Sequence, residues 1–461
     1  MSTQSAQDQQ ASTDAVEGPI VPTFFKYLVP SLVGLIAMTS ASLVDGFFIG
    51  NYVGVTALAA LNLIIPIMTI LFGVGMMLSI GGSVRGGKYL GEGDVEAASA
   101  IFSKTLISLA IYGFIVISLG LVFEDQIFAG VGATQELFPM MGEYYRIIMP
   151  FFFAQFAMVA LYFFIRLDGL PNLAATSLAV GAAINVVLDY LFIVVCEWGL
   201  TGAAFATGIS QCIPLLVMLY YFFWSKRRLK FSFGQKNWKE IFQAAYNGIS
   251  EFINEISGGI IAFIFNWMMI QRGGIDGVAA ITVVNYLLLL GFMVFFSISD
   301  TIQVMLSQNF GARQTKRMED FLKTASWLIL LASGFFITAL LTLSESLILL
   351  FVDEQSGGKM VAMATELMAY VWPVFLFAGA NMLISGYLTA IHLPFQSGLV
   401  ALCSSLVLPG GFLFLLYILL GDYRFVAALA VAEGVTFVIA FIIFLRHTPY
   451  AAVVAIDKSL N

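Results

Sequence analysis

Six acidic side chains lie inside long apolar stretches of this sequence, where charge is otherwise scarce. They are Asp45, Asp189, Glu251, Glu255, Asp300 and Glu433. No lysine or arginine falls deep inside these stretches to pair with them. A carboxylate at mid-helix depth in a membrane costs about 2.5–3.5 kcal/mol and usually marks a function. Because carboxyl groups without a basic partner tend to hold a proton in a low dielectric, the pattern indicates a chain that carries protons, or cations that replace protons.

The composition shows why these stretches are expected to cross a membrane. Of the 461 residues, 60% are hydrophobic and only 11% are charged, whereas soluble domains carry about 25% charged residues. Apolar runs of about 20 residues, long enough to cross ~30 Å of hydrocarbon, recur along the whole sequence. A backbone in hydrocarbon must satisfy its own hydrogen bonds, so these spans are predicted to be helices. The predicted fold class is an all-α polytopic membrane protein.

Twelve apolar runs are separated by polar segments. Their approximate ranges are 24–50, 56–82, 99–123, 138–165, 173–195, 200–224, 241–270, 277–303, 320–350, 361–390, 395–418 and 424–445. They form a predicted N-terminal six-helix bundle at 24–224 and a C-terminal six-helix bundle at 241–445, joined by a basic linker at 225–240. Tails are predicted at 1–23 and 446–461. The first tail is polar and acidic and lacks the pattern of a signal peptide, so we expect it to be disordered.

The basic residues predict the orientation of the spans. With the N-terminus inside, all but four of the 21 lysines and arginines lie on the inner side. The four exceptions are Arg146, Arg272, Lys359 and Arg424. The segment "KRRLKFSFGQKNWK", which begins at Lys226, is therefore expected to anchor the chain at the cytoplasmic face rather than to bind nucleic acid. Both termini are predicted to be cytoplasmic.

The two halves are related in sequence. A shift of 220 positions aligns "GVTALAALNLIIP" from Gly54 with "GIDGVAAITVVNY" from Gly274, and "KYLGEG" from Lys88 with "QNFGAR" from Gln308. Each half has an even number of spans, so the repeats have the same orientation. An axis along the membrane normal would relate them, with a cavity between the halves, which is typical of transporters.

Polar residues of the first half fall at one predicted depth. Asp45 lies toward the outer end of the first span and Asp189 toward the outer end of the fifth, with Asn185 one turn before it on the same face. The fourth and sixth spans begin outside, which places Tyr144 and Thr207 at a comparable depth. These side chains could therefore meet Asp45 at one level. The alternative is that each polar group is satisfied locally by a neighbouring backbone.

The acids of the second half form a looser pattern. Glu251 and Glu255 are one turn apart on the seventh span, so their charges repel and at least one is expected to be protonated or bound to a cation. Asp300 lies near the inner end of the eighth span, where it could instead reach cytoplasmic water. For Glu433 the sequence predicts no partner.

Pro30 lies early in the first span and removes one backbone hydrogen bond from the helix. One interpretation is a static bend. The other is that the first span bends and straightens when Asp45 changes charge.

These features resemble the multidrug and toxic compound extrusion (MATE) family. The resemblance covers residues 24–445. It is carried by twelve spans in two parallel halves, a basic central loop, and the motifs "LVDGFFIGNYVGVTALAALNL", "GKYLGEGD", "AAINVVLDYLFI", "GAAFATGIS" and "LSQNFGAR". The aspartate of the first span, together with the Asn-x-x-x-Asp pair of the fifth, is similar to the DinF-like bacterial branch of this family.

The resemblance implies a V-shaped antiporter of the bacterial inner membrane, which expels organic cations and amphipathic compounds as protons or sodium ions enter. By position, Asp45, Asn185 and Asp189 match the family's N-lobe cation network. Tyr144 and Thr207 match supporting members, although Tyr145 is an alternative to Tyr144 in "EYYR".

Two further positions are carried over from the family. Pro30 matches the bend of its first helix. Glu255 falls where another branch carries an acid for sodium coupling, so Glu255, Glu251 and Asp300 form an alternative C-lobe cation site. We therefore expect a proton-coupled drug exporter, with a sodium-coupled exporter as the alternative.

Other function classes are disfavoured. A flippase for a lipid-linked oligosaccharide would favour deep basic residues, which the spans lack. An intramembrane enzyme would need Gly-x-Gly-Asp or His-Glu-x-x-His motifs, and the only histidines are His392 and His447. No catalytic residue, no cofactor and no metal site are expected. The expected partners are small amphipathic drugs and membrane lipid, with no nucleic acid, and the chain is expected to be a monomer.

Overall fold

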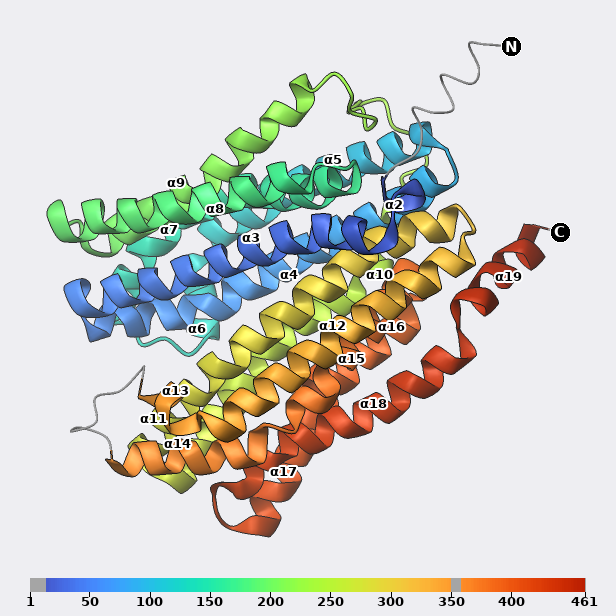
Figure 1. Ribbon diagram of the computed structural model, residues 1–461. Coiled ribbons are helices and arrows are strands. Elements are labelled where there is room, and N and C mark those ends of the chain that lie inside the picture. The colour runs from blue at the N-terminus through green and yellow to red at the C-terminus, as the bar shows by residue number, and fades with distance from the viewer. Residues whose placement is uncertain (1–13, 350–357, 461) are drawn as a thin grey trace, which may run out of the picture. The chain divides into compact units, whose positions relative to one another are not determined.

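The structure is a computed structural model that describes residues 14–349 and 358–460 (Figure 1). In this part of the chain every regular element is helical. The first half contains α2 (Asp14–Glu17), α3 (Ile20–Phe48), α4 (Val55–Gly91), α5 (Val95–Val122), α6 (Glu124–Gly130), α7 (Phe138–Leu167), α8 (Pro171–Asp189), α9 (Gly199–Met218) and α10 (Lys239–Asn247). The second half contains α11 (Ile249–Gly311), α12 (Thr315–Thr342), α13 (Ser344–Ile348), α14 (Gly358–Val371), α15 (Val374–Ala390), α16 (Pro394–Leu402), α17 (Leu408–Leu420), α18 (Ala428–Arg446) and α19 (Pro449–Leu460).

Within the described ranges, eleven helical segments are long and apolar enough to cross a membrane. Two more, Met360–Val371 and Val374–Ala390, are bent by 52° at a short break and give a twelfth span if they are counted as one. This pair corresponds to the predicted span at 361–390. The predicted all-α polytopic fold class is therefore confirmed.

α11 contains two of these spans, which meet at Gly274. This residue has φ 62° and ψ −156°, a backbone conformation that is essentially restricted to glycine. The chain can turn there because Gly274 has no Cβ. The seventh and eighth spans thus follow each other with only a single-residue break.

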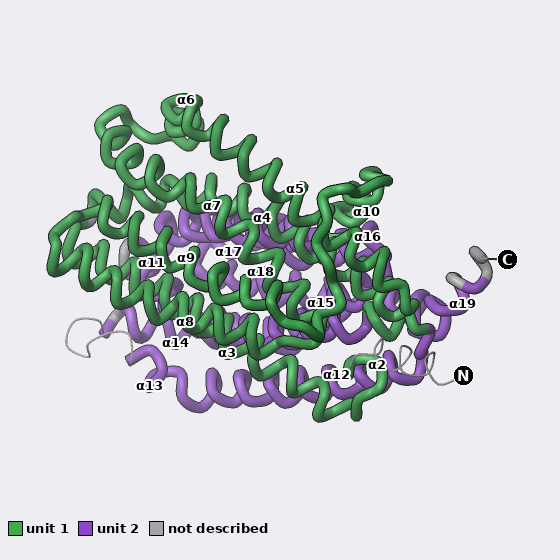
Figure 2. Tube along the Cα trace, turned by 90° about the horizontal axis from the view of Figure 1, so that it is seen from above, with its two compact units in different colours: residues 1–248, 307–312 green, residues 249–306, 313–461 purple. Residues whose placement is uncertain are grey.

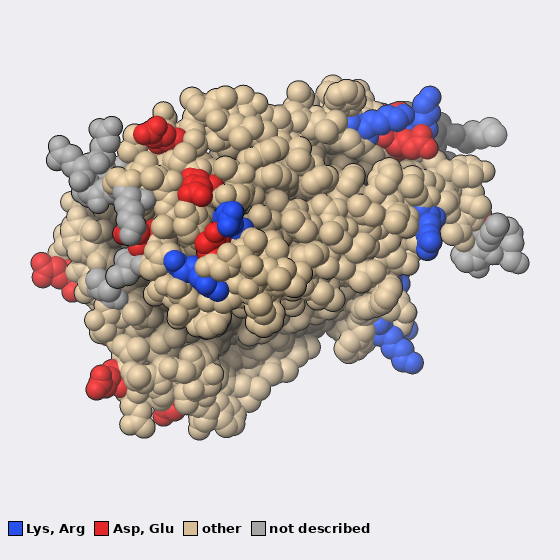
Figure 3. Space-filling model, turned by 90° about the horizontal axis from the view of Figure 1, so that it is seen from below, with Lys and Arg blue, Asp and Glu red and all other residues tan. Residues whose placement is uncertain are grey.

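Large apolar side chains cover the outsides of the long helices. Phe114 and Val122 on α5 are each 71% exposed, and Phe335 on α12 is 68% exposed. On the face drawn in Figure 3, charged side chains gather toward the ends of the helices and the surface between them is uncharged. An uncharged surface with many exposed apolar side chains matches a hydrocarbon environment.

The chain divides into two compact units (Figure 2). Unit 1 comprises the described residues up to Gly248 together with Ser307–Ala312. Unit 2 comprises Ile249–Leu306 and the described residues from Arg313 onward. The unit boundary thus falls at Gly248, and not at the predicted start of the second bundle at residue 241.

The seventh span begins at Ile249, so its predicted range of 241–270 started too early. The reason is α10, a separate short helix that packs against α4 in unit 1. Gly81 and Gly248 permit this packing, since a Cβ on either residue would overlap backbone atoms of the opposite helix. The seventh span starts only after this close contact.

The predicted disordered tail, 1–23, is ordered from Asp14 onward, and its first thirteen residues lie outside the described residues. Ala15 is fully buried, and its carbonyl accepts a hydrogen bond of 2.9 Å from the Asn309 amide nitrogen. Asp14 pairs with Lys26 of α3. Because these contacts fix the segment on unit 1, composition alone misjudged it.

The basic segment assigned to a linker also folds onto unit 1. The backbone N–H and the guanidinium Nε of Arg228 donate to the Asp168 carboxylate at 2.9 and 2.7 Å. The Tyr221 hydroxyl donates to the same carboxylate at 2.7 Å. The Lys230 backbone N–H donates to the Ser99 hydroxyl at 3.0 Å. The segment is therefore a bound part of unit 1.

Glu240 on α10 is the centre of an ion-pair cluster. The Lys104 ammonium and the Arg85 guanidinium Nε lie 2.6 and 2.8 Å from its two carboxylate oxygens, and the Tyr89 hydroxyl donates to it as well. Burial by itself raises the pKa of Glu240, but the three donors outweigh burial, so the pKa lies below its usual value.

The sequence repeat is visible as a reciprocal contact in unit 1. A Cβ on Gly91 would overlap the carbonyl oxygen of Gln308, and a Cβ on Gly311 would overlap the carbonyl oxygen of Lys88. Each residue of one pair is 220 positions from its counterpart in the other pair. The end of α4 and the end of α11 therefore cross at backbone distance, as small-xxx-small segments do in membrane helices.

We predict that Glu240→Gln lowers the free energy of unfolding by about 3–5 kcal/mol at neutral pH, because it leaves Lys104 buried without a counter-charge. Since the pKa of Glu240 is lowered in the folded state, its contribution is complete above the usual carboxyl pKa and is lost as the pH falls through the lowered value. Thermal unfolding in detergent at neutral and acidic pH measures both effects. The control Glu92→Gln, which removes an exposed pair with Lys88, should cost less than about 1 kcal/mol. Equal midpoints for the two variants would contradict this role of Glu240.

We also predict that Gly311→Ala destabilises the fold by about 1–3 kcal/mol, because the added methyl group overlaps the Lys88 carbonyl. The matched control is Gly334→Ala on α12, where the added Cβ meets no atom within 4 Å. The control should be neutral or stabilising by up to about 1 kcal/mol, since alanine is the better helix former. Thermal unfolding of both variants tests the crossing, and a Gly311→Ala protein as stable as the control would refute it.

Candidate functional site

The five residues predicted for a cation network lie close together in unit 1. Asp45 is on α3, Tyr144 on α7, Asn185 and Asp189 on α8, and Thr207 on α9. α8 packs against both α3 and α9, and α7 packs against α9. This arrangement brings polar side chains of four spans to one place in an otherwise apolar bundle.

A cavity of about 110 Å³ lies among these helices. Asp45, Asn185 and Thr207 line it from three different helices, and Met158 contributes from α7. Gly181 on α8 lies against Pro214 of α9, so the two helices approach closely beside the cavity. A space of this size accommodates small ions or water, but it is too small for a drug molecule.

The two aspartates have few partners in the protein. Asp189 is fully buried, and neither of its carboxylate oxygens forms a hydrogen bond with described residues. Asp45 is partly exposed, but its Oδ1 is buried and likewise has no hydrogen-bond partner there. The two carboxyl groups are close enough to interact electrostatically. Buried acceptors without donors are rare in proteins and require an explanation.

Tyr144 and Thr207 complete the polar group. Tyr144 is buried and interacts electrostatically with both aspartates. The Thr207 hydroxyl lies beside Asp45 and Tyr144, although its oxygen forms no hydrogen bond of normal geometry. Of the two adjacent tyrosines, Tyr144 therefore faces the aspartates.

Tyr145 points to a different neighbourhood. Its hydroxyl lies against Gly120 of α5, where a Cβ would crowd it, and its ring packs edge-to-face on Phe128 with centroids 5.3 Å apart. The structure therefore distinguishes the two tyrosines of "EYYR", which the sequence did not.

The buried basic side chains of unit 1 belong to other contacts. Lys104 pairs with Glu240, and the Arg166 guanidinium lies over the Tyr162 ring at 4.9 Å. Among the described ion pairs, none involves Asp45 or Asp189. The absence of a basic partner, expected from the sequence, thus holds for the described part of the chain.

Two residues of the cavity wall were not predicted from the sequence. Ser210 and Gln211 line the cavity one turn after Thr207 on α9, and the Gln211 Oε1 is buried without a hydrogen-bond partner. Their signal was present in the sequence: residues 207, 210 and 211 have helical i, i+3, i+4 spacing and form a polar stripe on the sixth span.

Pro30 lies inside α3, which continues as a helix from Ile20 to Phe48. The next residue, Ser31, is buried, and its hydroxyl accepts a long hydrogen bond of 3.5 Å from Tyr162. Pro30 and Asp45 are therefore on one continuous helix.

The acids of α11 meet in unit 2. Glu251 is buried and accepts a hydrogen bond of 3.2 Å from the Gln303 amide nitrogen. Asp300 and Glu255 both interact electrostatically with Glu251. Asp300 is 4% exposed, so it does not reach water in this structure. The alternative C-lobe cluster is thus a local group formed by the two arms of α11.

Glu433 has partners that the sequence did not reveal. Its carboxylate accepts hydrogen bonds from Asn381 and Ser404. The expectation of no nameable partner was wrong, because these residues are uncharged and lie on other spans.

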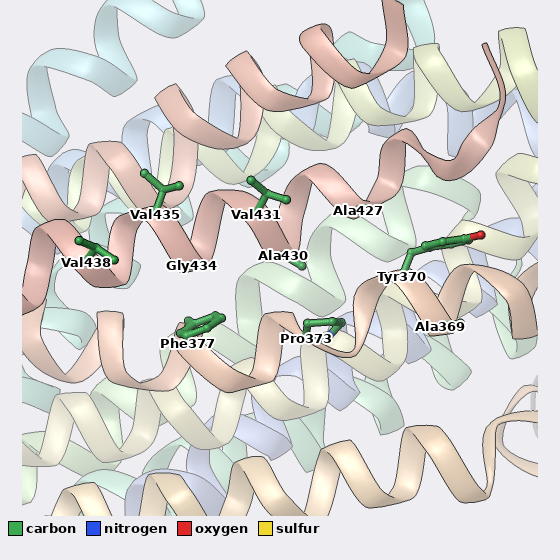
Figure 4. Close-up of a pocket in the computed structure, with 10 residues that line it drawn as sticks. All are labelled: Ala369, Tyr370, Pro373, Phe377, Ala427, Ala430, Val431, Gly434, Val435 and Val438. Atoms are coloured by element: carbon green, nitrogen blue, oxygen red, sulfur yellow. The ribbon is translucent and has the colours of Figure 1, made fainter. Parts of the chain in front are cut away.

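Among the described residues, no three His, Cys, Asp or Glu side chains gather in a way that could hold a metal ion. A hollow with a volume of about 630 Å³ lies in unit 2 among α14, α15 and α18 (Figure 4). Phe377, Val431, Val435 and Val438 give it an apolar wall, and Tyr370 provides the one hydroxyl among its lining residues. This hollow suits hydrocarbon and carries no acid–base chemistry.

Comparison with known proteins places these observations in one family. The MatE family matches residues 30–191 and 252–409. The chain is 23% identical over 434 residues to "Multidrug export protein MepA" of Staphylococcus aureus (strain NCTC 8325 / PS 47), covering 93% of this chain and 94% of that protein. It is 24% identical over 441 residues to the protein of the same name from Staphylococcus haemolyticus (strain JCSC1435), with the same coverage.

A solved structure shares the fold. It is described as "Crystal structure of MATE in complex with MaL6", and its TM-score is 0.88 at 21% sequence identity. The similarity covers 96% of this chain and 99% of that chain.

Proposed function

Since the chain belongs to the MatE family, we propose that it is a secondary active multidrug exporter that moves drugs outward in exchange for inward-moving protons. The family is one of transporters, so this chain is a multi-span membrane transporter and not an enzyme. The relatives named for multidrug export support amphipathic drugs as substrates. We further propose that the chain resides in the inner membrane as a monomer with both termini cytoplasmic, and that it has no cofactor.

The environment of the pair Asp45 and Asp189 is the observation that supports proton coupling. The two carboxyl groups interact, three of their oxygens are buried without a hydrogen-bond partner in the described residues, and no basic side chain neutralises them. Two interacting carboxylates cannot both ionise cheaply in a low dielectric, so a proton on one of them stabilises the pair. We infer that this pair, oriented by Asn185, Tyr144 and Thr207, is the coupling site.

The coupling step follows from the change in charge. In the outward-facing state the pair takes up a proton, and neutralisation of the group allows α3 to repack against α8 and α9. The repacking releases the drug outward. Proton loss to the inside restores the charge and resets the cycle. Proton and drug thus bind to alternative states of unit 1.

Sodium coupling is the second candidate, and it also has a structural basis. Glu251, Glu255 and Asp300 meet in unit 2, where Gln303 adds an amide. Carboxylate and amide oxygens are ligands that hard cations prefer. This cluster would be the coupling site if sodium ions drive export. A lipid-linked oligosaccharide flippase has less support, because the buried basic groups Lys104 and Arg166 are engaged with Glu240 and with the Tyr162 ring.

We predict that Asp45→Asn slows proton-driven drug efflux by about tenfold or more, because the pair loses one of its two titrating carboxyl groups. Everted vesicles with an imposed proton gradient measure drug uptake and drug-induced proton release. The control Asp422→Asn changes an aspartate that lies outside the spans and pairs with Arg424, and it should leave efflux unchanged. Wild-type efflux and proton exchange in Asp45→Asn would contradict the proposed role of Asp45 in proton coupling.

The coupling ion is decided by imposing the two gradients separately. We expect a proton gradient alone to drive export by the wild-type protein and by Glu255→Gln. If a sodium gradient alone drives export and Glu255→Gln abolishes it, coupling moves to the cluster of unit 2 and the proton mechanism at Asp45 fails.

We propose that Pro30 allows α3 to bend during the cycle. Pro30 has no N–H, so the carbonyl of Lys26 lacks its helical donor and the helix can bend at low cost. Pro30→Ala restores that donor and should raise the thermal midpoint while it slows drug efflux. An unchanged efflux rate in a folded Pro30→Ala protein would show that the proline is only a static feature.

A further inference from the structure

Glu433 is a buried acid that the coupling mechanism above does not use. It lies on α18 in unit 2 and is 8% exposed. Its Oε2 accepts a hydrogen bond of 2.6 Å from the Asn381 Nδ2 of α15. Its Oε1 accepts one of 2.9 Å from the Ser404 hydroxyl. Both carboxylate oxygens are thus held by uncharged donors from other spans.

The orientation of the Asn381 amide is determined by a second contact. The same Nδ2 donates to the backbone carbonyl of Glu433 at 2.9 Å. A carbonyl can only accept, so the opposite orientation of the amide would place two acceptors against each other. Asn381 is 1% exposed and cannot turn toward water instead. The carboxyl group of Glu433 therefore faces a fixed N–H donor.

No described charged group balances Glu433. The elements packed against α18 are α14, α15, α16, α17 and the turns η4 (Cys403–Val407) and η5 (Tyr423–Ala427). Eight described titratable side chains lie on these elements and on α18 itself: Glu366, Tyr370, Tyr387, Cys403, Tyr417, Tyr423, Arg424 and, on α18, Arg446. The side chain of Lys359 on α14 lies outside the described residues. None of these eight side chains forms a hydrogen bond or ion pair with Glu433: Arg424 pairs with Asp422, Tyr423 donates to Glu366, and Tyr387 donates to the backbone of His447.

Ser404 allows the carboxyl group to be bonded in both protonation states. When Glu433 is ionised, the serine hydroxyl donates to Oε1 across the 2.9 Å between the two oxygens. When a proton sits on Oε1, the hydroxyl rotates and accepts that proton in a hydrogen bond. Neither state requires heavy atoms to move. Ser404 also lies in a π-helical turn, a feature that is frequent at functional sites.

The chemistry of the neighbours favours a proton over a metal ion. A cation such as sodium or calcium requires several oxygen lone pairs directed at it. Here the nearest amide presents its N–H to the carboxylate, and among the described residues no second carboxylate interacts with it. The site therefore suits a carboxyl group that binds and releases a proton.

We propose that Glu433 is a second proton-binding site, located in unit 2, that takes up one proton on Oε1 and releases the same proton independently of Asp45 and Asp189. The exchange forms and breaks one O–H bond and changes no other covalent bond. Its place in the fold parallels the first site, because α18 and α9 are the sixth spans of their halves. Glu433 and Gly434 occupy the middle of one, as Thr207 and Gly208 occupy the middle of the other.

Infrared difference spectroscopy of the purified full-length protein tests this proposal without any transport assay. Spectra recorded over the pH range in which the protein stays folded show the carbonyl stretch of each carboxylic acid that gains a proton. We expect a band that titrates in the wild-type protein and in Asp45→Asn but is missing in Glu433→Gln. A failure of drug export in Asp45→Asn would therefore leave this result unaffected.

A second variant keeps the acid and changes only its donor. Asn381→Leu keeps the branching and the number of heavy atoms of the side chain and removes a charge-assisted hydrogen bond that stabilises the ionised form. The band should persist and titrate at higher pH than in the wild-type protein. Three results would overturn the proposal: a spectrum of Glu433→Gln identical to the wild type, a band that never titrates, or a titration that Asn381→Leu leaves unchanged.

Discussion

The exclusion of water from the spans is the constraint on which the rest of this structure depends. In hydrocarbon each backbone group must bond within its own helix, and each charge must be paired, neutralised or placed at an end. The basic residues follow the first option, since Lys104 and Arg85 pair with Glu240, and Arg228 pairs with Asp168. These pairs fix α10 and the segment after α9 to unit 1. These ion pairs thus do not involve the acids inside the spans, such as Asp45 and Asp189.

The acids inside the bundles show the other side of the same constraint. Asp189 is fully buried with no hydrogen bond from described residues, whereas Glu433 is buried with a neutral donor on each oxygen. Neither arrangement is what a structural ion pair requires, since a basic partner would lock the carboxylate in its ionised form. A group that must gain and lose a proton is better served by neutral neighbours. The proposed proton chemistry therefore depends on the lack of basic partners for these acids as much as on the acids themselves.

The fold class was predictable from the sequence alone, because it depends on periodic and local signals, and the same signals predicted that Asp45, Asn185 and Asp189 lie at one depth of the first half. Apolar length identified the spans, and helical spacing aligned Asn185 with Asp189. Contacts between uncharged residues could not be predicted in this way. Asn381 and Ser404 are ordinary polar residues in apolar runs, and only the packing of α15 and α17 against α18 brings Asn381 to Glu433 and places η4 beside it. The choice between Tyr144 and Tyr145 likewise depended on the rotation of α7 about its axis, because adjacent helical residues point about 100° apart. The composition of a membrane span does not determine that rotation.

The internal repeat explains which features are shared by the two halves and which are not. The contacts of Gly91 with Gln308 and of Gly311 with Lys88 are counterparts of each other, so a larger residue at either glycine breaks the same crossing. Such steric demands act on the backbone and retain small residues at both positions. A titrating acid has different requirements. It must lie deep in a span, near uncharged donors and away from basic side chains, and several spans can provide this environment. A symmetric scaffold can therefore carry its titrating groups on the first and fifth spans in one half and on the seventh, eighth and twelfth in the other.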